Sequence, residues 1–359
     1  MRLRPVLLLL FLLAPVVQAQ QIDPKVFMAL ESARTAQQSG DLRAAQRGLD
    51  EALKSTSADS LEQALVQQRL GYLAIEREEY AAAIRWLKLA LAQDQLSAEA
   101  AQQDRRNLAQ LLVQQGQYAE AVKLLEAEEV SGLPLATRRL LVQAYRELKQ
   151  YRKAIPLAEQ IVRANPAAED IWYQLLAGMN YELRRYGDAV EWLQVLVRRA
   201  PERSDNWRQL ASMQSMAGKQ AEAAATLRLA HEGGVGLRAG DLDNLVALHA
   251  QAGAPWQAAR LLDALIEQKL LPTDREHQLR LAQLWQAARD REQALSAWQQ
   301  LARQSGDARY WLQVAYLQYQ QDDWSGMQAT LSQFRPGNAE QRRQVQSLRN
   351  AAAAAQAGL

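Results

Sequence analysis

One short sequence pattern recurs along the chain at intervals of 33–38 residues. It centres on an alanine in eight of its nine copies. A large apolar residue follows four positions later in eight copies, and an aromatic residue stands three positions earlier in five. A chain with this periodicity folds as a row of similar units in which each unit contacts its neighbours. The central positions are Ala45, Ala83, Ala121, Ala154, Ala189, Ala223, Ala258, Ala294 and Met327.

The spacing within each copy indicates an amphipathic helix. Residues one, four and seven positions after the central alanine share one stripe of a helix, so this helix buries one face. We expect the alanine to lie where two helices cross closely, because a larger side chain would push them apart. A glycine five positions earlier, as at Gly40, Gly116, Gly218 and Gly253, allows a tight turn. The pattern therefore predicts an all-α fold of helix–turn–helix units.

The repeat resembles the tetratricopeptide repeat (TPR) family. The family pattern W-x2-L-G-x2-Y…A-x3-F…P is present in parts in about nine copies. Pairs such as Leu70-Gly71 precede the central alanine, and Pro166 and Pro201 close two copies. Few copies carry the full set, and Met327 replaces the alanine in the last one.

This resemblance implies a right-handed α–α superhelix with a concave groove. Residues 26–333 are expected to form the TPR solenoid of about nine units. Residues 338–355 are expected to form a C-terminal capping helix and tail, because an array must cover its last apolar face. Most of the large apolar side chains are then core residues.

The chain begins with a predicted secretory signal. Two arginines precede a 12-residue apolar run at residues 6–17, and small residues follow up to Ala19. Residues 1–19 are therefore predicted to be a signal peptide cleaved after Ala19. A membrane anchor is the alternative, but a run of this length, interrupted by Pro15, is too short to span a bilayer.

Export would change the charge balance. The full chain has 42 Lys+Arg and 40 Asp+Glu, and loss of Arg2 and Arg4 makes these numbers equal. A chain without net charge has no bulk attraction to nucleic acid or to an anionic membrane. The absence of cysteine excludes disulfides, thiol catalysis and a lipid anchor on cysteine. The predicted location is the periplasm of a Gram-negative bacterium.

No sequence motif predicts catalysis, so we expect no catalytic residue, no metal site, no cofactor and no enzyme activity. His231, His249 and His277 lack the spacing of metal ligands and are expected at surface or inter-repeat positions. The string GGVGLRAG at residues 233–240 partly matches a nucleotide-binding loop. It follows a predicted helix instead of a strand, which favours an inter-repeat turn or a joint between two halves of the superhelix.

A repeat array of this kind binds partners, and the first helix of each unit is expected to line the groove. The residues at the groove positions of the central units are rich in arginines and amides. The guanidinium group of arginine is suited to binding carboxylates, so we expect the groove to bind an acidic or carboxylate-bearing peptide. The alternative is that this concave face is only a solvated polar surface. Glu147 and Glu182 flank the set. The predicted groove residues are Gln103, Arg106, Gln110, Arg139, Gln143, Arg146, Gln174, Tyr181, Arg208 and Ser212.

Several stretches resemble a narrower group, the periplasmic repeat proteins encoded beside TonB and its ExbB/ExbD-type motor. They include YRKAIPLAEQIV from Tyr151, WYQLLAGMNYELRRYGDAV from Trp172, WRQLASMQSMAGKQAEAAATLRLAHEGG from Trp207 and WLQVAYLQYQQDDW from Trp311. This resemblance implies a periplasmic accessory to energised outer-membrane transport.

Three functions stay open at this point: two in which the chain is a binding scaffold, and one in which it is part of an enzyme. The first is a non-enzymatic scaffold that holds TonB, ExbB or ExbD-type components, and the alternative is an assembly scaffold for exopolysaccharide or cell-wall synthesis. The third is an enzyme or enzyme subunit whose activity needs none of the motifs sought. An extended, proline-rich arm such as that of TonB-type proteins would suit a concave groove with amide and guanidinium donors.

Overall fold

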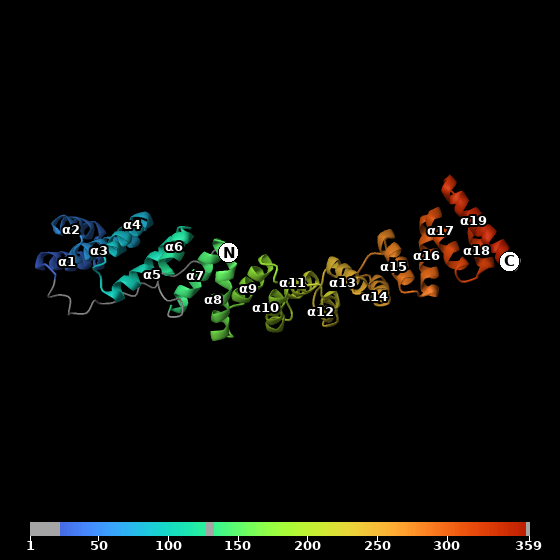
Figure 1. Cartoon of the computed structure of the whole chain (residues 1–359), viewed down its shortest axis with the longest axis horizontal. Coiled ribbons are helices and arrows are strands. Elements are labelled where there is room, and N and C mark those ends of the chain that lie inside the picture. The colour runs from blue at the N-terminus through green and yellow to red at the C-terminus, as the bar shows by residue number, and fades with distance from the viewer. Residues whose placement is uncertain (1–21, 127–132, 357–359) are drawn as a thin grey trace. The chain divides into compact units, whose positions relative to one another are not determined.

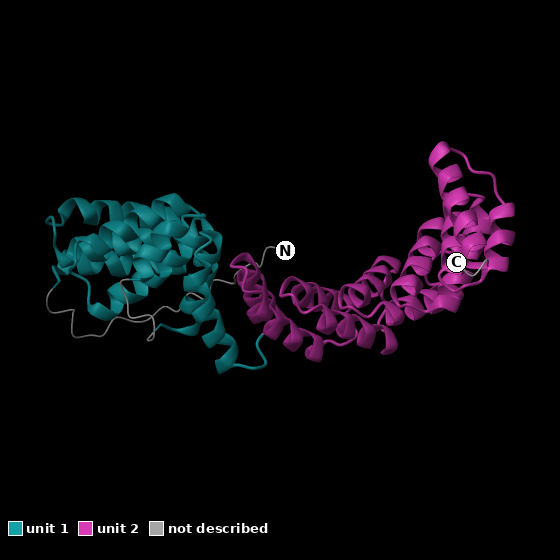
Figure 2. Cartoon of the chain, turned by 45° about the vertical axis from the view of Figure 1, so that its right-hand side comes forward, with its two compact units in different colours: residues 1–168 teal, residues 169–359 magenta. Residues whose placement is uncertain are grey.

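The computed structural model describes residues 22–126 and 133–356, and the predicted signal peptide lies outside these ranges. The described residues form α-helices and no strand (Figure 1). The chain divides into two compact units, Met1–Ala168 and Glu169–Leu359 (Figure 2). Residues 233–240 lie inside the second unit, so the division between the units does not fall there. No helix within the described ranges is both long enough and apolar enough to cross a membrane.

Unit 1 is a row of helix pairs in which each helix packs against the next. The first member of a pair is called the first helix and the second member the second helix. The pairs are α1 (Pro24–Gln38) with α2 (Leu42–Ser55), α3 (Leu61–Glu76) with α4 (Tyr80–Ala92), α5 (Ala98–Gln114) with α6 (Tyr118–Leu125), and α7 (Leu135–Glu147) with α8 (Tyr151–Ala164).

Unit 2 repeats this arrangement and forms a curved row (Figure 2). The prediction of an all-α repeat of helix pairs is therefore confirmed. The pairs are α9 (Asp170–Glu182) with α10 (Tyr186–Arg199), α11 (Ser204–Met216) with α12 (Gln220–Glu232), α13 (Ala239–Gln251) with α14 (Pro255–Glu267), α15 (Arg275–Ala287) with α16 (Arg291–Ser305), and α17 (Ala308–Tyr319) with α18 (Trp324–Ser332), followed by α19 (Ala339–Gln356).

The same backbone turn ends the first helix of every described pair. The residue five positions before the central alanine has a positive φ, and the residue after it donates its N–H five residues back, as Gln117 does to the Leu112 carbonyl at 2.8 Å. This is the hydrogen bond of a Schellman motif. Glycine occupies the positive-φ position in four pairs, and larger residues adopt it in the other five. The nine residues are Gly40, Glu78, Gly116, Lys149, Arg184, Gly218, Gly253, Arg289 and Asp322.

The central alanines are buried where the two helices of a pair meet. Each is 0–1% exposed, from Ala45 to Ala294. The crossing of the second pair is close, since a Cβ on Gly71 would lie 2.8 Å from the Leu87 side chain. Leu87 is itself fully buried. Small residues at the crossing therefore let the larger apolar side chains of the second helix reach the first.

Helix α19 covers the end of the array. It packs against α17 and α18, and its Val345 and Ala352 share a hydrophobic cluster with Met327. Met327 is fully buried at the position that alanine occupies in the other pairs. The last pair thus uses a longer apolar side chain where its neighbour is a single helix instead of another pair.

The turn geometry predicts opposite effects for one substitution at two glycines of unit 2. Gly218 has φ +78°, so Gly218→Ala should destabilise α11 and α12 by about 1 kcal/mol. Gly178 lies inside α9 with open space around its Cβ position, so Gly178→Ala should stabilise α9 by about 0.5–1 kcal/mol. Hydrogen exchange of the helix peptides measures both. Equal effects at the two sites would contradict the turn assignment.

Candidate functional site

In unit 1 the predicted groove residues lie on α5 and α7, the first helices of consecutive pairs, which pack against each other. Gln103, Arg106 and Gln110 lie on α5, and Arg139, Gln143 and Arg146 lie on α7. Gln143 is exposed and the other five are half-buried. Gln103 donates to Asn107 Oδ1 on its own helix at 3.0 Å, and we call the remaining five residues the first-helix face of unit 1.

This face combines amides with guanidinium groups. The side-chain amides of Gln110 and Gln143 each offer both donors and an acceptor, which match a peptide group. Arg146 forms an ion pair with Glu147, so a carboxylate of the chain already contacts that guanidinium. Arg106 and Arg139 add two further guanidinium groups to the face, on two different helices, and a guanidinium group suits a planar carboxylate.

A buried carboxylate joins α3 to α5 next to this face. Asp104 is 1% exposed and accepts a hydrogen bond from Gln68 Nε2 at 2.6 Å and another from the Tyr72 hydroxyl. Asn107 Nδ2 donates to the same hydroxyl oxygen at 2.8 Å. A buried carboxylate with two donors is satisfied, so this network fixes the register of the two first helices.

Burial controls the protonation of this network. It raises the pKa of Asp104, although the hydrogen bonds from Tyr72 and Gln68 act in the opposite direction. Burial and the adjacent charge of Asp104 raise the pKa of Tyr72 well above its usual range. Tyr72 therefore keeps its proton and remains the donor.

In unit 2 the predicted residues lie on two first helices that both pack against α10. Gln174 and Tyr181 lie on α9 and are exposed, and the Tyr181 ring lies 6.0 Å from that of Tyr186. Ser212, on α11, is exposed, and Arg208 on the same helix is half-buried. These positions offer an aromatic ring and small polar groups, with a single cation.

That cation is held by carboxylates of the chain. Arg208 forms an ion pair with Asp205, and its Nε lies 3.9 Å from Asp241 Oδ1. Asp205 also occupies one of the first-helix positions expected to face the groove, but it is not among the groove residues predicted from the sequence. The groove arginine of unit 2 is therefore paired within the chain, and it is a poor candidate for binding an external carboxylate.

Three polar contacts join consecutive first helices, and the two residues of each contact lie about one repeat apart in the sequence. In each case a polar residue on one first helix meets a polar residue in the first half of the next. The repeat pattern does not reveal these contacts, because each repeat contributes a single residue and its type differs from one repeat to the next. The pairs are Gln68 with Asp104, Arg208 with Asp241, and Asp243 with His277.

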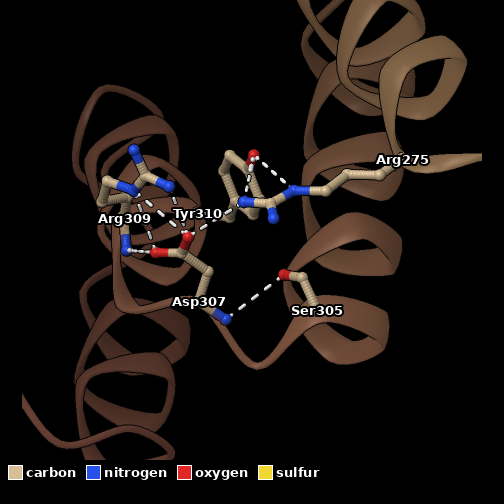
Figure 3. Close-up of polar contacts among 5 residues, drawn as sticks. All are labelled: Arg275, Ser305, Asp307, Arg309 and Tyr310. Carbon is tan, nitrogen blue, oxygen red and sulfur yellow. Dashed lines mark hydrogen bonds and ion pairs between the residues drawn. The ribbon is translucent and has the colours of Figure 1, made fainter.

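A cluster of charged residues joins α15 to α17 (Figure 3). Asp307 caps α17 and accepts from Arg309 Nη2 at 2.7 Å and from Arg275 Nη2 at 3.2 Å. Arg275 also donates to the Tyr310 hydroxyl at 3.1 Å, and Ser305 Oγ accepts from the Asp307 N–H at 3.2 Å. Hydrogen bonds from Arg309, followed by the charges of the two arginines, lower the pKa of Asp307 to about 2. The cluster links two pairs and leaves no carboxylate to titrate near neutrality.

The described residues hold no group of three or more His, Asp or Glu side chains that would bind a metal ion. The described residues form an all-α repeat with polar side chains along its first helices. Such arrays act through their extended surfaces.

The family match agrees with this class. Residues 139–204 match the model of the tetratricopeptide repeat, so this segment carries TPR sequence. TPR proteins bind peptides and proteins, and this fold is generally a non-catalytic binding scaffold.

Solved structures similar to the chain include a TPR protein from Parabacteroides merdae, with 16% identity, 73% of this chain and 99% of that chain covered, and a TM-score of 0.39. MamA from Desulfovibrio magneticus is 20% identical, with 50% of this chain and 96% of the MamA chain covered, and has a TM-score of 0.36. YrrB, described as a TPR protein with an unusual peptide-binding site, has 14% identity, 51% and 91% coverage and a TM-score of 0.38. No curated protein matches the chain.

The network around Asp104 predicts a local loss of stability when its carboxylate is removed. Asp104→Ala leaves two half-buried donors without their acceptor, which should cost about 2–4 kcal/mol in the opening of α3 and α5. Glu99→Ala, an exposed site on the same helix, should change stability by less than about 0.5 kcal/mol. Hydrogen exchange of the α3 and α5 peptides distinguishes the two, and a similar effect of both substitutions would refute the structural role of Asp104.

Proposed function

We propose that the chain is a non-enzymatic scaffold that binds a protein partner through the first-helix face of unit 1. The observation that carries this proposal is the alignment of amides and guanidinium groups on α5 and α7, two first helices in contact. These helices are positioned by their alanine crossings and, on α5, by the buried Asp104 network. The face is thus polar, preorganised and supported by a rigid core.

The chemistry of the face favours an extended segment that carries carboxylates. The amides of Gln110 and Gln143 would bind main-chain groups of the segment, and Arg106 and Arg139 would bind its acidic side chains. Unit 2 would contribute contacts of a different kind, through Tyr181 and Ser212, because Arg208 already contacts two carboxylates of the chain.

We further propose that the protein works in the periplasm as an accessory to a TonB-type transport system, with TonB, ExbB or ExbD-type components as partners. The support for the location is the signal-like start at residues 1–19, and the support for the pathway is the resemblance carried by the central repeats. An extended arm from an inner-membrane component is the kind of ligand that the face would take.

Site-specific cross-linking in living cells tests the partner and the face together. A photoreactive residue at Gln143 on α7 should capture an inner-membrane transport component, which mass spectrometry of the adduct identifies. Gln160 on α8 is the matched control, since it is also an exposed glutamine of unit 1 but lies on a second helix. The yield of the cross-linked adduct at Gln160 should be at least about tenfold lower than at Gln143, because contact with the partner is confined to the first helices.

Equal capture from Gln143 and Gln160 would overturn the assignment of the face. Capture of proteins unrelated to transport, together with normal iron and haem uptake in a deletion strain, would overturn the assignment of the pathway and leave the scaffold role in place.

The charge preference is tested at Arg139 with the captured partner. Arg139→Gln removes one charge-assisted contact and should weaken binding by about tenfold. Arg163→Gln on α8 is the control, because Arg163 is an exposed arginine of the same unit that pairs with Glu159 at 3.2 Å. Calorimetry at low and moderate salt measures both affinities. Binding that is insensitive to Arg139→Gln would show that carboxylates of the partner do not bind this face.

A further inference from the structure

His277 lies between two carboxylates from different helices. It stands in the first turn of α15 and is 9% exposed. Its Nδ1 lies 2.7 Å from Oδ1 of Asp274, the N-cap residue of α15. Its Nε2 lies 3.1 Å from Oδ1 of Asp243, on α13. Both ring nitrogens thus face a carboxylate oxygen at hydrogen-bonding distance.

Only one protonation state of the His277 ring satisfies both of these contacts. A neutral imidazole carries one N–H and an ionised carboxylate oxygen only accepts, so a neutral ring donates to one of the two aspartates and places a lone pair against the other. The imidazolium donates from both nitrogens. The arrangement is therefore complete only when His277 is protonated.

Arg280 reinforces the same contact one turn further along α15. Its Nη1 lies 3.4 Å from Asp243 Oδ1, and its Nη2 donates to the Asp243 main-chain carbonyl at 3.1 Å. Asp243 accordingly receives donors from two residues of α15. Because α13 and α15 each pack against α14, these side chains form a direct bridge between two first helices that are otherwise connected through α14.

The charged groups around the ring are few. Asp243 faces it from α13 and Asp274 from the N-cap of α15. Arg275 points to Asp307 and Tyr310 instead. Among the described residues, no charged side chain of α14 or α16, which also pack against α15, contacts His277.

The balance of these effects favours the charged ring. Burial lowers the pKa of His277, but the hydrogen bond to Asp274 and the charges of Asp243 and Asp274 outweigh it, so the pKa is raised above its ordinary value. His249, by contrast, is half-buried near Arg228, and its partial burial and the charge of Arg228 both lower its pKa.

We propose that His277 is a pH-sensitive clamp that joins α13 to α15 when protonated and releases one of its two carboxylates when neutral. The clamp holds two consecutive pairs of unit 2 in register. Its release loosens the packing of α15 against α13 and so alters the spacing of the first-helix side chains in this part of the array. This device is independent of the partner that the chain binds.

The direction of the pH dependence follows from linkage. A histidine with a higher pKa in the folded chain binds protons more tightly there than in the unfolded chain, whose value is about 6.5. The stabilisation by the clamp is fully present below that unfolded value. It is lost as the pH rises through the raised pKa of folded His277.

Nuclear magnetic resonance of the full chain, labelled with ¹⁵N-histidine, tests the protonation directly. His277 should show two protonated ring nitrogens at mildly acidic pH and should lose a proton at a higher pH than His249. Asp243→Asn should lower the pKa of His277 and leave that of His249 unchanged. A neutral His277 ring at pH 6, or a pKa unaffected by Asp243→Asn, would overturn the proposal.

Hydrogen exchange tests whether protonation controls the packing. The protection of α13 and α15 peptides, measured relative to α9 and α10 peptides of the same unit, should decrease from pH 5.5 to pH 8.5 in the parent chain. His277→Gln keeps a donor and an acceptor but does not titrate, so this decrease should disappear. Asp243→Asn, which keeps the histidine, should reduce the decrease. The same pH dependence in all three chains would refute the clamp.

Discussion

The close crossing of two helices around a small residue is the constraint on which the structure depends. At eight of the nine described crossings a buried alanine lets the second helix approach the first, and in most pairs a leucine one turn later fills the space between them. A fully buried leucine such as Leu87 contributes about 1.5–3 kcal/mol. One pair cannot bury its whole apolar stripe, so each pair depends on the next, and the last depends on α19. The positive-φ turn then sets the direction in which every second helix returns.

Most of this architecture could be predicted from the sequence, because the crossing and the apolar stripe repeat at one period. The turn was visible where it carries glycine, as at Gly116, but Arg184 and Asp322 adopt the same conformation without that signal. The hydrogen bonds of the Schellman motif are made by main-chain atoms, which explains why the turn tolerates such different side chains.

The candidate site was less predictable than the fold. The positions that face one way on a first helix follow from helical periodicity, so Arg106, Arg139 and Gln143 could be chosen from sequence. Which arginines already contact acids of the chain depends on residues one repeat away. Asp241 follows Arg208 by 33 residues and Asp243 precedes His277 by 34, and no local pattern connects them. The same stacking that makes the fold easy to predict therefore hides the polar contacts between units.

These contacts divide the array into parts with different chemistry. In unit 2 the first-helix residue Arg208 contacts two carboxylates of the chain, and in unit 1 Arg106 and Arg139 lie on the same helices as the amides of Gln110 and Gln143. The most direct test of this account is hydrogen exchange of the full chain with and without its captured partner. We expect added protection in α5 and α7 and little change in α6 and α8. Protection confined to the second helices, or to unit 2 alone, would contradict it.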